Sequence, residues 1–504
     1  MRSDHVWITE IDPVGGDGPL AGTTFAVKDN IDVAGVPTTA ACPTFAYVPE
    51  TSALVVQRLV DAGAAVAGKT NMDQFATGLT GTRSPHGACR SVLDPDRISG
   101  GSSSGSAVAV AGGEVTFSLG TDTAGSGRVP AACNGIVGLK PTPGLLSIAG
   151  IVPACRSVDC PSVFTATVPE ARRMLRVLAP DAALARGGAF RLGVPDERTL
   201  DLLPDAARDA FGATASGFDT VEVDLNPFFT AGDLLYSGAW LAERYESVGR
   251  FIEAHPDEVH PVVASIVLRG KTKTAAEAFA DRYLLDDLAR VVAASMVSID
   301  ALLLPTVAHV PTVDEVLADP VGTNTTLGRF TTFVNLLGMC AVAVPGVGRA
   351  DGVPSGVSVI APGGDDHRAL DIAEAVTRGR LQLAVVGAHL EGQPLNHQLS
   401  SRGARLVQRT TTATTYRLHA LATTPPKPGL VRAADGGAAI EVEVWSLPPD
   451  GFGSFVAEVP PPLAIGTIEL ADGTWVSGFV CEPWALDGAP DITHFGGWRA
   501  YLAT

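Results

Sequence analysis

The chain has 504 residues, of which 46% are hydrophobic, and a formal net charge of −18. This length predicts two domains, or one large domain with a smaller one, and the apolar content suffices for a large core. The negative charge argues against nucleic acids and anionic membranes as partners. The apolar runs are too short, or too interrupted by Gly and Pro, to span a bilayer.

Cellular location and metal binding are constrained by the N-terminus and the cysteines. Residues 1–18 are largely polar, so we expect no signal peptide. The seven cysteines form no CxxC pair, which favours reduced thiols over a disulfide framework or a zinc site. Cys155 and Cys160 also lack a convincing histidine partner. We therefore expect a cytoplasmic protein that binds no metal.

The first informative element is an apolar strand that begins near Phe25 and ends at Lys28. Lysine has a free pKa of about 10.4, so it acts as a base at neutral pH only where burial or nearby cations favour the neutral amine. The chain has only six lysines against thirty arginines. A lysine in this apolar setting is therefore an unusual choice and a candidate base.

The segment Gly63–Thr70 matches the phosphate-binding pattern GxxxxGK[ST]. A true P-loop follows a strand and precedes a helix. Here residues 52–62 have helical periodicity and Ala64–Ala67 is itself predicted to be a strand, so the order is inverted. We do not expect nucleotide binding at this segment.

Two Gly- and Ser-rich loops follow, Gly100–Ser106 and Gly120–Pro130. Residues 107–111 between them have a small apolar helix pattern, and Val115–Leu119 is predicted to be a buried strand that leads into the second loop. A strand that ends in a tight Gly/Ser turn directs backbone N–H groups and a hydroxyl into one small space. The alternative is that Ser102–Ser106 only cap the following helix.

Several motifs in this order resemble the amidase signature family, which cleaves amides with a Ser-Ser-Lys triad. They are Ala26–Asp29, Gly68–Met72, Gly100–Ser103, Gly120–Asp122, Gly125–Ser126 and Gly138–Thr142. The resemblance covers roughly the first 380 residues and implies a central mixed β-sheet covered by helices.

Carried over by position, the resemblance implies Ser126 as nucleophile, Ser102 as a bridging serine in a cis peptide after Gly101, and Lys28 as base. The backbone N–H groups of Thr123, Ala124, Gly125 and Ser126 would bind the oxyanion. The family usually has two glycines before the nucleophile, and here Ala124 replaces the first. A Cβ makes a positive φ costly at that position.

Residues up to about 380 alternate helices and strands, which indicates an α/β domain. The expected strands include Arg191–Pro195, Ala301–Pro305, Cys340–Pro345 and Gly356–Ile360, and the expected helices 274–295 and 366–380. We place the catalytic domain at residues 1–382.

A smaller β-rich α+β domain is expected at residues 383–504, where Pro- and Gly-rich turns separate short predicted strands. These strands are Tyr416–Ala420, Ala439–Trp445, Phe455–Val459, Gly466–Glu469 and Trp475–Cys481.

This second part resembles the C-terminal domain of the allophanate hydrolases, a branch of the same family. The resemblance rests on the opening Val385–Leu390 with Pro394–Asn396 and on the ending Ile492–Arg499. It implies hydrolysis of allophanate to ammonia and carbon dioxide through N-carboxycarbamate. His389 and His397, both in the opening motif, are candidates for proton transfer in the second stage, and each could instead be a structural histidine.

The segment Leu234–Tyr245 resembles the substrate segment of that branch, which implies that Tyr236 and Arg244 bind the substrate. Eight positions along one helix would place them within about 80° of each other, and the planar guanidinium suits the carboxylate of allophanate. The alternative is an amphipathic surface helix. Gly78 is expected to add a backbone contact to the substrate.

Other functions stay open at this stage. The chain could be another small-amide amidase, an amidotransferase A-type subunit, or a scaffold without catalysis. We expect no cofactor. A biotin-dependent urea carboxylase is a possible functional link, and a homodimer is possible.

Overall fold

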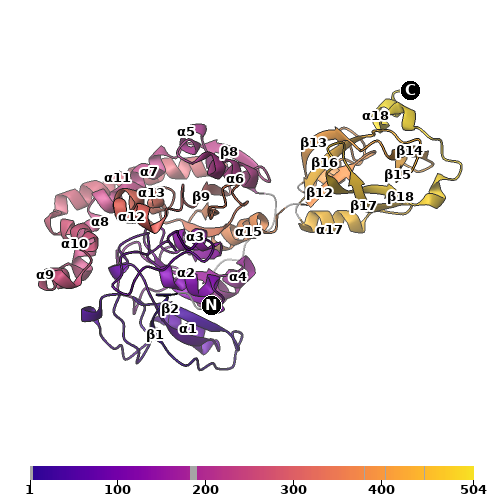
Figure 1. Cartoon of the computed structure of the whole chain (residues 1–504). Coiled ribbons are helices and arrows are strands. Elements are labelled where there is room, and N and C mark those ends of the chain that lie inside the picture. Colours follow the sequence, from indigo (N-terminus) through magenta and orange to yellow (C-terminus); the bar gives the residue numbers. More distant parts are fainter. Residues whose placement is uncertain (1–3, 182–189, 380, 403, 448) are drawn as a thin grey trace. The chain divides into compact units, whose positions relative to one another are not determined.

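The computed structural model describes residues 4–181, 190–379, 381–402, 404–447 and 449–504. They divide into two compact units, unit 1 (residues 1–377) and unit 2 (residues 378–504), each labelled in Figure 1. Each unit has its own hydrophobic core.

Unit 1 is built on a mixed β-sheet with eleven strands among the described residues, in the order β1-β3-β2-β4-β6-β5-β10-β11-β9-β7-β8. Strands β2, β3 and β4 run parallel to one another, as do β7, β8 and β9, and the remaining neighbours pair antiparallel. The strands are β1 Trp7–Glu10, β2 Thr24–Lys28, β3 Ala65–Thr70, β4 Phe117–Asp122, β5 Val137–Lys140, β6 Cys160–Thr165, β7 Arg191–Pro195, β8 Asp219–Val223, β9 Ala301–Pro305, β10 Cys340–Pro345 and β11 Gly356–Ala361.

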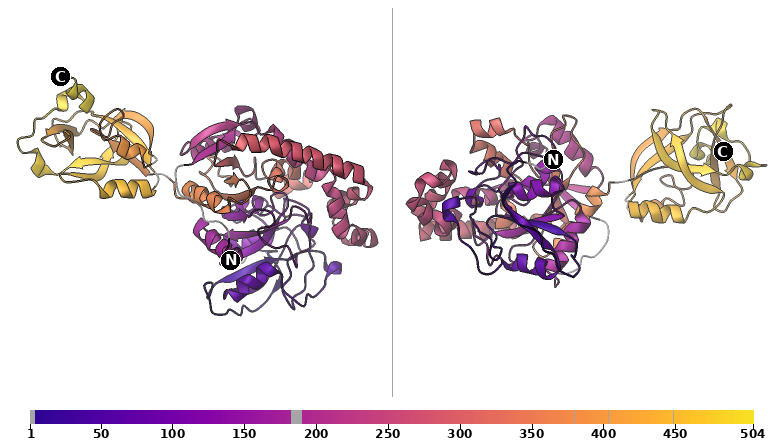
Figure 2. Two further views of the ribbon diagram at one scale, coloured as in Figure 1. Left: turned by 180° about the vertical axis from the view of Figure 1, so that it is seen from behind. Right: turned by 60° about the horizontal axis from the view of Figure 1, so that its bottom comes forward.

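Helices cover both faces of this sheet (Figures 1 and 2). In β10, Val342 packs in the cluster that includes α1, α4 and α15, while Ala343 packs on the other face with α2 and α3. The helices are α1 Leu54–Asp61, α2 Ser104–Ala111, α3 Val129–Asn134, α4 Val168–Leu178, α5 Glu197–Leu200, α6 Asp205–Ala215, α7 Asn226–Ser237, α8 Trp240–Arg244, α9 Arg250–Ala254, α10 Pro261–Leu268, α11 Ala275–Met296, α12 Val313–Ala318, α13 Gly322–Gly328, α14 Thr332–Leu336 and α15 Asp366–Thr377. Burial on both faces explains the continuous apolar runs in β9 and β10.

The predicted elements of unit 1 agree closely with the structure. The strands β7, β9 and β10 have the predicted bounds, and α11 begins one position later, after a capping box between Thr274 and Glu277. Strand β4 continues to Asp122, further than predicted, so its last residues enter the second glycine-rich loop. Helix α15 ends at Thr377, before its predicted end at Arg380, which lies outside the described residues.

The segment that matches the P-loop pattern has the predicted inverted order, with helix α1 before it and strand β3 within it. The Lys69 Nζ lies 3.4 Å from Asp29 Oδ1 and donates to Thr38 Oγ1 at 2.9 Å. Lys69 is fully buried. Its amine is therefore engaged inside the core and is not presented to a phosphate.

Unit 2 contains a five-stranded sheet in the order β13-β16-β12-β18-β17 and a two-stranded sheet of β14 and β15 among its described residues. The strands are β12 Leu381–Val385, β13 Arg405–Thr411, β14 Tyr416–Leu421, β15 Lys427–Arg432, β16 Glu441–Leu447, β17 Leu463–Glu469 and β18 Trp475–Cys481, and the helices are α16 His397–Ser400, α17 Pro449–Ala457 and α18 Trp498–Leu502.

One strand prediction in unit 2 is wrong. Residues 455–459 were expected to be a strand, but Phe455 lies near the end of helix α17. Phe455 packs into the core of unit 2. A short buried apolar run does not by its pattern alone distinguish a strand from a helix segment.

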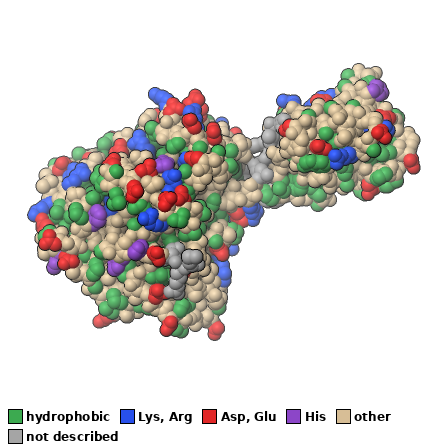
Figure 3. Space-filling view, viewed as in Figure 1, with side chains coloured by type: hydrophobic (Ala, Val, Ile, Leu, Met, Phe, Trp, Pro, Cys, Tyr) green, Lys and Arg blue, Asp and Glu red, His purple; other side chains and the backbone are tan. Residues whose placement is uncertain are grey.

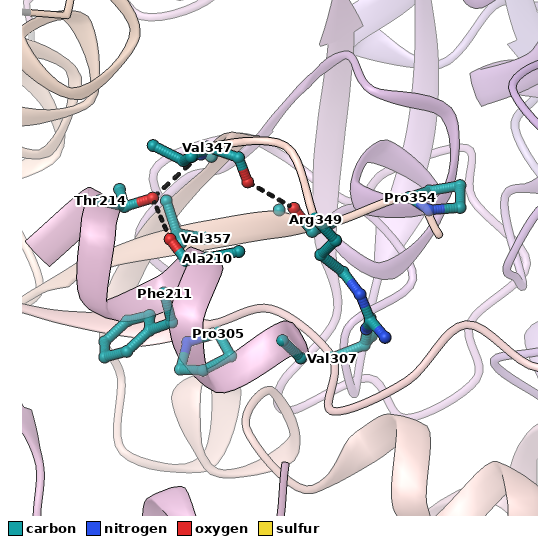
Figure 4. Close-up of a pocket in the computed structure, with 13 residues that line it drawn as sticks. Ala210, Phe211, Thr214, Pro305, Val307, Val347, Arg349, Pro354 and Val357 are labelled. Carbon is teal, nitrogen blue, oxygen red and sulfur yellow. Dashed lines mark hydrogen bonds between the residues drawn. The ribbon is translucent and has the colours of Figure 1, made fainter. Parts of the chain in front are cut away.

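The surface of the molecule is mixed in character. Acidic and basic side chains are interspersed with apolar ones on the visible face (Figure 3). Among the described residues, no helix combines the length and the apolar character that crossing a membrane requires. A hollow beside Thr214 and Val357 measures about 20 Å³ (Figure 4), room for about one water molecule. It holds none of the predicted site residues.

Candidate active site

Lys28 ends strand β2 and is fully buried. Its Nζ donates to Ser102 Oγ at 2.8 Å and to Thr121 Oγ1 at 2.7 Å. Burial lowers the Lys28 pKa to about 7, and the more distant charges of Asp73, Asp159 and Asp122 offset only part of that effect. A buried lysine with hydroxyl partners is thus available as a neutral amine near physiological pH.

Ser102 precedes helix α2 and is fully buried. The Gly101–Ser102 peptide bond is cis, as the resemblance implied. A Cβ at Gly101 would lie 2.1 Å from Asp73 Oδ2 and 2.5 Å from the backbone nitrogen of Gly81. Only glycine fits there, so the two backbone segments approach closely enough to place Ser102 against Lys28.

The turn after β4 is organised by Asp122. Arg128 donates to both oxygens of this carboxylate at 2.9 Å, and the N–H groups of Gly125 and Gly127 do so as well, each at 2.9 Å. Burial alone would raise the Asp122 pKa, but the charge and hydrogen bonds of Arg128 hold it below its usual value. Asp122 is therefore an ionised anchor for the loop that carries Ser126.

These contacts narrow the predicted set of oxyanion donors. The Gly125 N–H is directed at Asp122 and is not free, whereas Thr123, Ala124 and Ser126 donate no backbone hydrogen bond to any described residue. Gly125 has φ +137°, and a Cβ there would meet Thr331 Oγ1 at 2.3 Å. Ala124 is not among the described residues with positive φ, so its Cβ is compatible with this turn.

Ser126 lies in this loop between β4 and α3 and is 2% exposed. Within the described part of the chain, no hydrogen bond joins its hydroxyl to Ser102 or to Lys28. The connection runs instead through the backbone, because Thr121, which contacts Lys28, belongs to the strand that leads into the loop. The structure thus joins Lys28 and Ser102 directly and leaves the Ser126 hydroxyl uncommitted.

Tyr236 and Arg244 were expected on one continuous helix, and this is wrong. Helix α7 ends at Ser237, Gly238 is extended with φ −89° and ψ −165°, and α8 begins at Trp240. The Ala239 N–H donates to Asp281 Oδ2 at 2.7 Å, which holds the break. Even so, the Arg244 guanidinium lies 5.0 Å from the centre of the Tyr236 ring, so the two side chains do meet.

The Arg244 side chain is buried with little to bind. It is 1% exposed, and its one hydrogen bond to a described residue is a long contact of 3.4 Å from Nη1 to Thr77 Oγ1. Its Nε and Nη2 have no partner among the described residues. The neighbouring Gly78 has φ +156°. A buried guanidinium with unused donors, next to a glycine turn, is suited to bind an anion.

The two histidines of unit 2 have different surroundings. His389 is buried, stacks on Phe479 with ring centres 5.1 Å apart, and shares a hydrogen bond with Gln398. Burial lowers its pKa. His397 contacts the carbonyl of Pro394 through Nδ1 at 2.9 Å, the kind of bond expected of a structural histidine.

Several site residues were missed from the sequence. Thr121 contacts Lys28, Arg128 pairs with Asp122, and the Thr123 hydroxyl donates to Asp159 Oδ1 at 2.6 Å. Asp159 is buried, and burial raises its pKa. Thr121 and Arg128 lie within or beside the glycine-rich motifs, so a search for polar residues there would have found them. Asp159 is far along the chain and gave no such signal.

Two family models match the chain. One, described as Amidase, matches residues 10–370. The other, described as Allophanate hydrolase C-terminal domain, matches residues 381–503.

Similar proteins include relatives of both kinds. The urea amidolyase of Saccharomyces cerevisiae is 38% identical over 96% of this chain, which spans only 30% of that protein. A glutamyl-tRNA(Gln) amidotransferase of Halobacterium salinarum, in its A-type subunit, is 34% identical over 74% of this chain and 99% of its own. The solved allophanate hydrolase of Kluyveromyces lactis is 39% identical over 96% of this chain and 89% of its own, with a TM-score of 0.65.

Proposed function

Because this chain belongs to the amidase family and carries an allophanate hydrolase C-terminal domain, we propose that it hydrolyses allophanate, the N-carboxylate of urea. The products are ammonia and carbon dioxide, formed through N-carboxycarbamate. We assign the hydrolytic step to residues 1–382 and the second stage to residues 383–504.

The observation that carries this proposal is the state of Arg244. Its guanidinium is buried against Tyr236, and two of its nitrogens have no partner among the described residues. A buried charge without a counter-ion is destabilising, so this position favours a ligand with a carboxylate. Allophanate carries a carboxylate and an amide in one small molecule, which suits a site with both an anion-binding group and an activated serine.

The first stage uses the groups around Lys28. Neutral Lys28 takes the proton of Ser102, and Ser102 takes that of Ser126, whose oxygen attacks the terminal amide carbonyl of allophanate. The free N–H groups of Thr123, Ala124 and Ser126 stabilise the oxyanion. The tetrahedral intermediate collapses as the leaving nitrogen accepts a proton through the same relay, and ammonia departs. Water then hydrolyses the acyl-enzyme.

The second stage begins with N-carboxycarbamate, which loses carbon dioxide to give carbamate and then a second ammonia. We assign assistance in this stage to unit 2. His389 is the better candidate for proton transfer, because burial lowers its pKa and so keeps its imidazole neutral, and His397 is already bonded to a backbone carbonyl.

Supply of the substrate is a further part of the proposal. The chain spans about a third of the urea amidolyases that it matches, 30% of their length. We propose that a biotin-dependent urea carboxylase, as a separate protein, forms the allophanate used here. A cytoplasmic location fits the seven cysteines, each a buried free thiol, and homodimer formation is part of the same proposal.

Ammonia release from allophanate by the purified full-length protein tests this function. The expected result is release that requires Ser126, with biuret, the neutral carboxamide analogue, hydrolysed poorly. The similarity to the A-type subunits of amidotransferases makes another amidase activity the alternative. Equal rates on allophanate, biuret and simple amides would favour that alternative.

A further inference from the structure

A cavity of about 510 Å³ lies beside Tyr236 in unit 1. Its walls come from helix α7, the end of α10 with the following turn, helix α13 and residues 79–83. This volume exceeds the needs of one small amide, and the predicted catalytic residues do not line it.

The cavity shares its wall with the candidate active site. Arg83, which lines it, donates to the Thr77 carbonyl at 3.1 Å, and Arg244 contacts the hydroxyl of the same residue. Leu79, also in the lining, packs in the cluster that includes Ala124 of the oxyanion loop. Tyr236 belongs both to the lining and to the contact with Arg244.

The cavity is positively charged in an acidic protein. Its lining has three arginines, Arg83, Arg269 and Arg329, and one carboxylate, Asp233, whereas the whole chain has a net charge of −18. Arg83 is 2% exposed, donates to backbone carbonyls, and has no partner for its Nε among the described residues. A buried guanidinium without a paired carboxylate favours anions in the space beside it.

Arg269 and Arg329 lie toward the solvent side of this cavity. Arg269 is exposed and donates to the carbonyl of Tyr236 at 3.4 Å. Arg329 stacks over the Phe229 ring at 3.9 Å, keeps 38% of its side chain exposed, and lies 3.9 Å from Asp233. Neither arginine forms a close ion pair with a described residue, so both charges act on the cavity.

We propose that this cavity is the entry that concentrates the anionic substrate next to Arg244, with Arg269 and Arg329 as specificity-determining residues for anionic over neutral amides. The inference rests on the proposed function and adds a second set of cations to it. A large net negative charge repels an anionic substrate from the surface, and a local cationic lining offsets that repulsion.

The test measures binding of allophanate and biuret by calorimetry in the Ser126→Ala background, which stops turnover. Arg269→Gln and Arg329→Gln are each expected to weaken allophanate binding about two- to threefold at low salt, and the double variant more. The difference should shrink strongly between an ionic strength of about 0.01 M and about 1 M, because the Debye length falls from about 30 Å to about 3 Å. Biuret binding should not change.

Charge-conserving and remote variants are the controls. Arg269→Lys and Arg329→Lys should bind allophanate nearly as the parent does, and Arg198→Gln, an exposed arginine outside the lining, should have no effect. Losses that are equal for biuret, that persist at high salt or that the lysine variants share would overturn the inference. Absence of allophanate binding and hydrolysis in the parent protein would contradict the proposed function itself, and with it this inference.

Discussion

The two units surround their candidate catalytic groups with different kinds of side chain. In unit 1, Lys28, Asp122 and Asp159 are all fully buried or nearly so, and each forms polar contacts with its neighbours. In unit 2, His389 lies between Phe455 and Phe479 with one polar contact, to Gln398. Buried charges that hold one another in place suit bond cleavage with charged intermediates, while a single neutral imidazole suits proton transfer to an already unstable product.

A second comparison lies within unit 1, between two buried lysines on adjacent parallel strands. Lys69 lies 3.4 Å from the carboxylate of Asp29, whereas Lys28 contacts hydroxyls and a carbonyl. A carboxylate partner favours the ammonium form. The kind of partner, rather than burial, therefore separates a structural lysine from a candidate base.

The largest effect is expected from Ser126→Ala. Loss of the attacking oxygen should reduce ammonia release by about 10⁴-fold or more, because the covalent path is closed. Ser106→Ala is the matched control, since the Ser106 hydroxyl bonds Thr70 and Leu119 outside the catalytic contacts. Residual activity within about tenfold of the wild type would be too high for a covalent nucleophile and would remove Ser126 from that role.

The two lysines give a matched pair. Lys28→Met should abolish most activity, because the relay loses its base. In the wild type, kcat/KM should rise as the pH increases through about 7, since only the neutral form of Lys28, whose pKa is lowered to about 7, accepts a proton. Lys69→Met is expected to lower the free energy of unfolding by leaving Asp29 unpaired.

The measurement that separates these roles is the pH–rate profile together with thermal unfolding. Any remaining activity of Lys69→Met should keep the wild-type pH dependence. An unchanged profile in Lys28→Met with substantial activity would mean that another group is the base.

A smaller loss is expected for Arg244→Lys, which keeps the charge but removes the planar fork. Allophanate affinity should fall about tenfold to a hundredfold, because a charged bidentate contact is lost. Biuret, which has no carboxylate, should be affected less. Inhibition or binding constants for both compounds decide the matter, and equal losses would show that Arg244 serves the fold alone.

Much of the fold and part of the site could be predicted from the sequence. The strands β7, β9 and β10 are long apolar runs between turn residues, and such patterns specify strands well. Lys28 and Ser102 belong to local motifs, so their contact followed from resemblance. These features depend on residues that are close in sequence.

Features that depend on distant residues could not be predicted. The break at Gly238 is held by Asp281, and the Thr123 hydroxyl is held by Asp159. The helical interpretation of Leu234–Tyr245 ignored the break because its apolar spacing continues across the glycine. The role of Phe455 depends on the core that it enters, which its own short segment does not specify.

The division of work between the units is tested most directly by carbon-13 NMR of labelled allophanate, comparing the full-length protein, His389→Ala and a chain ending at Arg380. The account predicts that all three release the first ammonia at similar rates. N-carboxycarbamate should disappear fastest with the wild type and persist longer with the other two. Identical time courses for the intermediate in all three samples would contradict the account and leave unit 2 without a catalytic part.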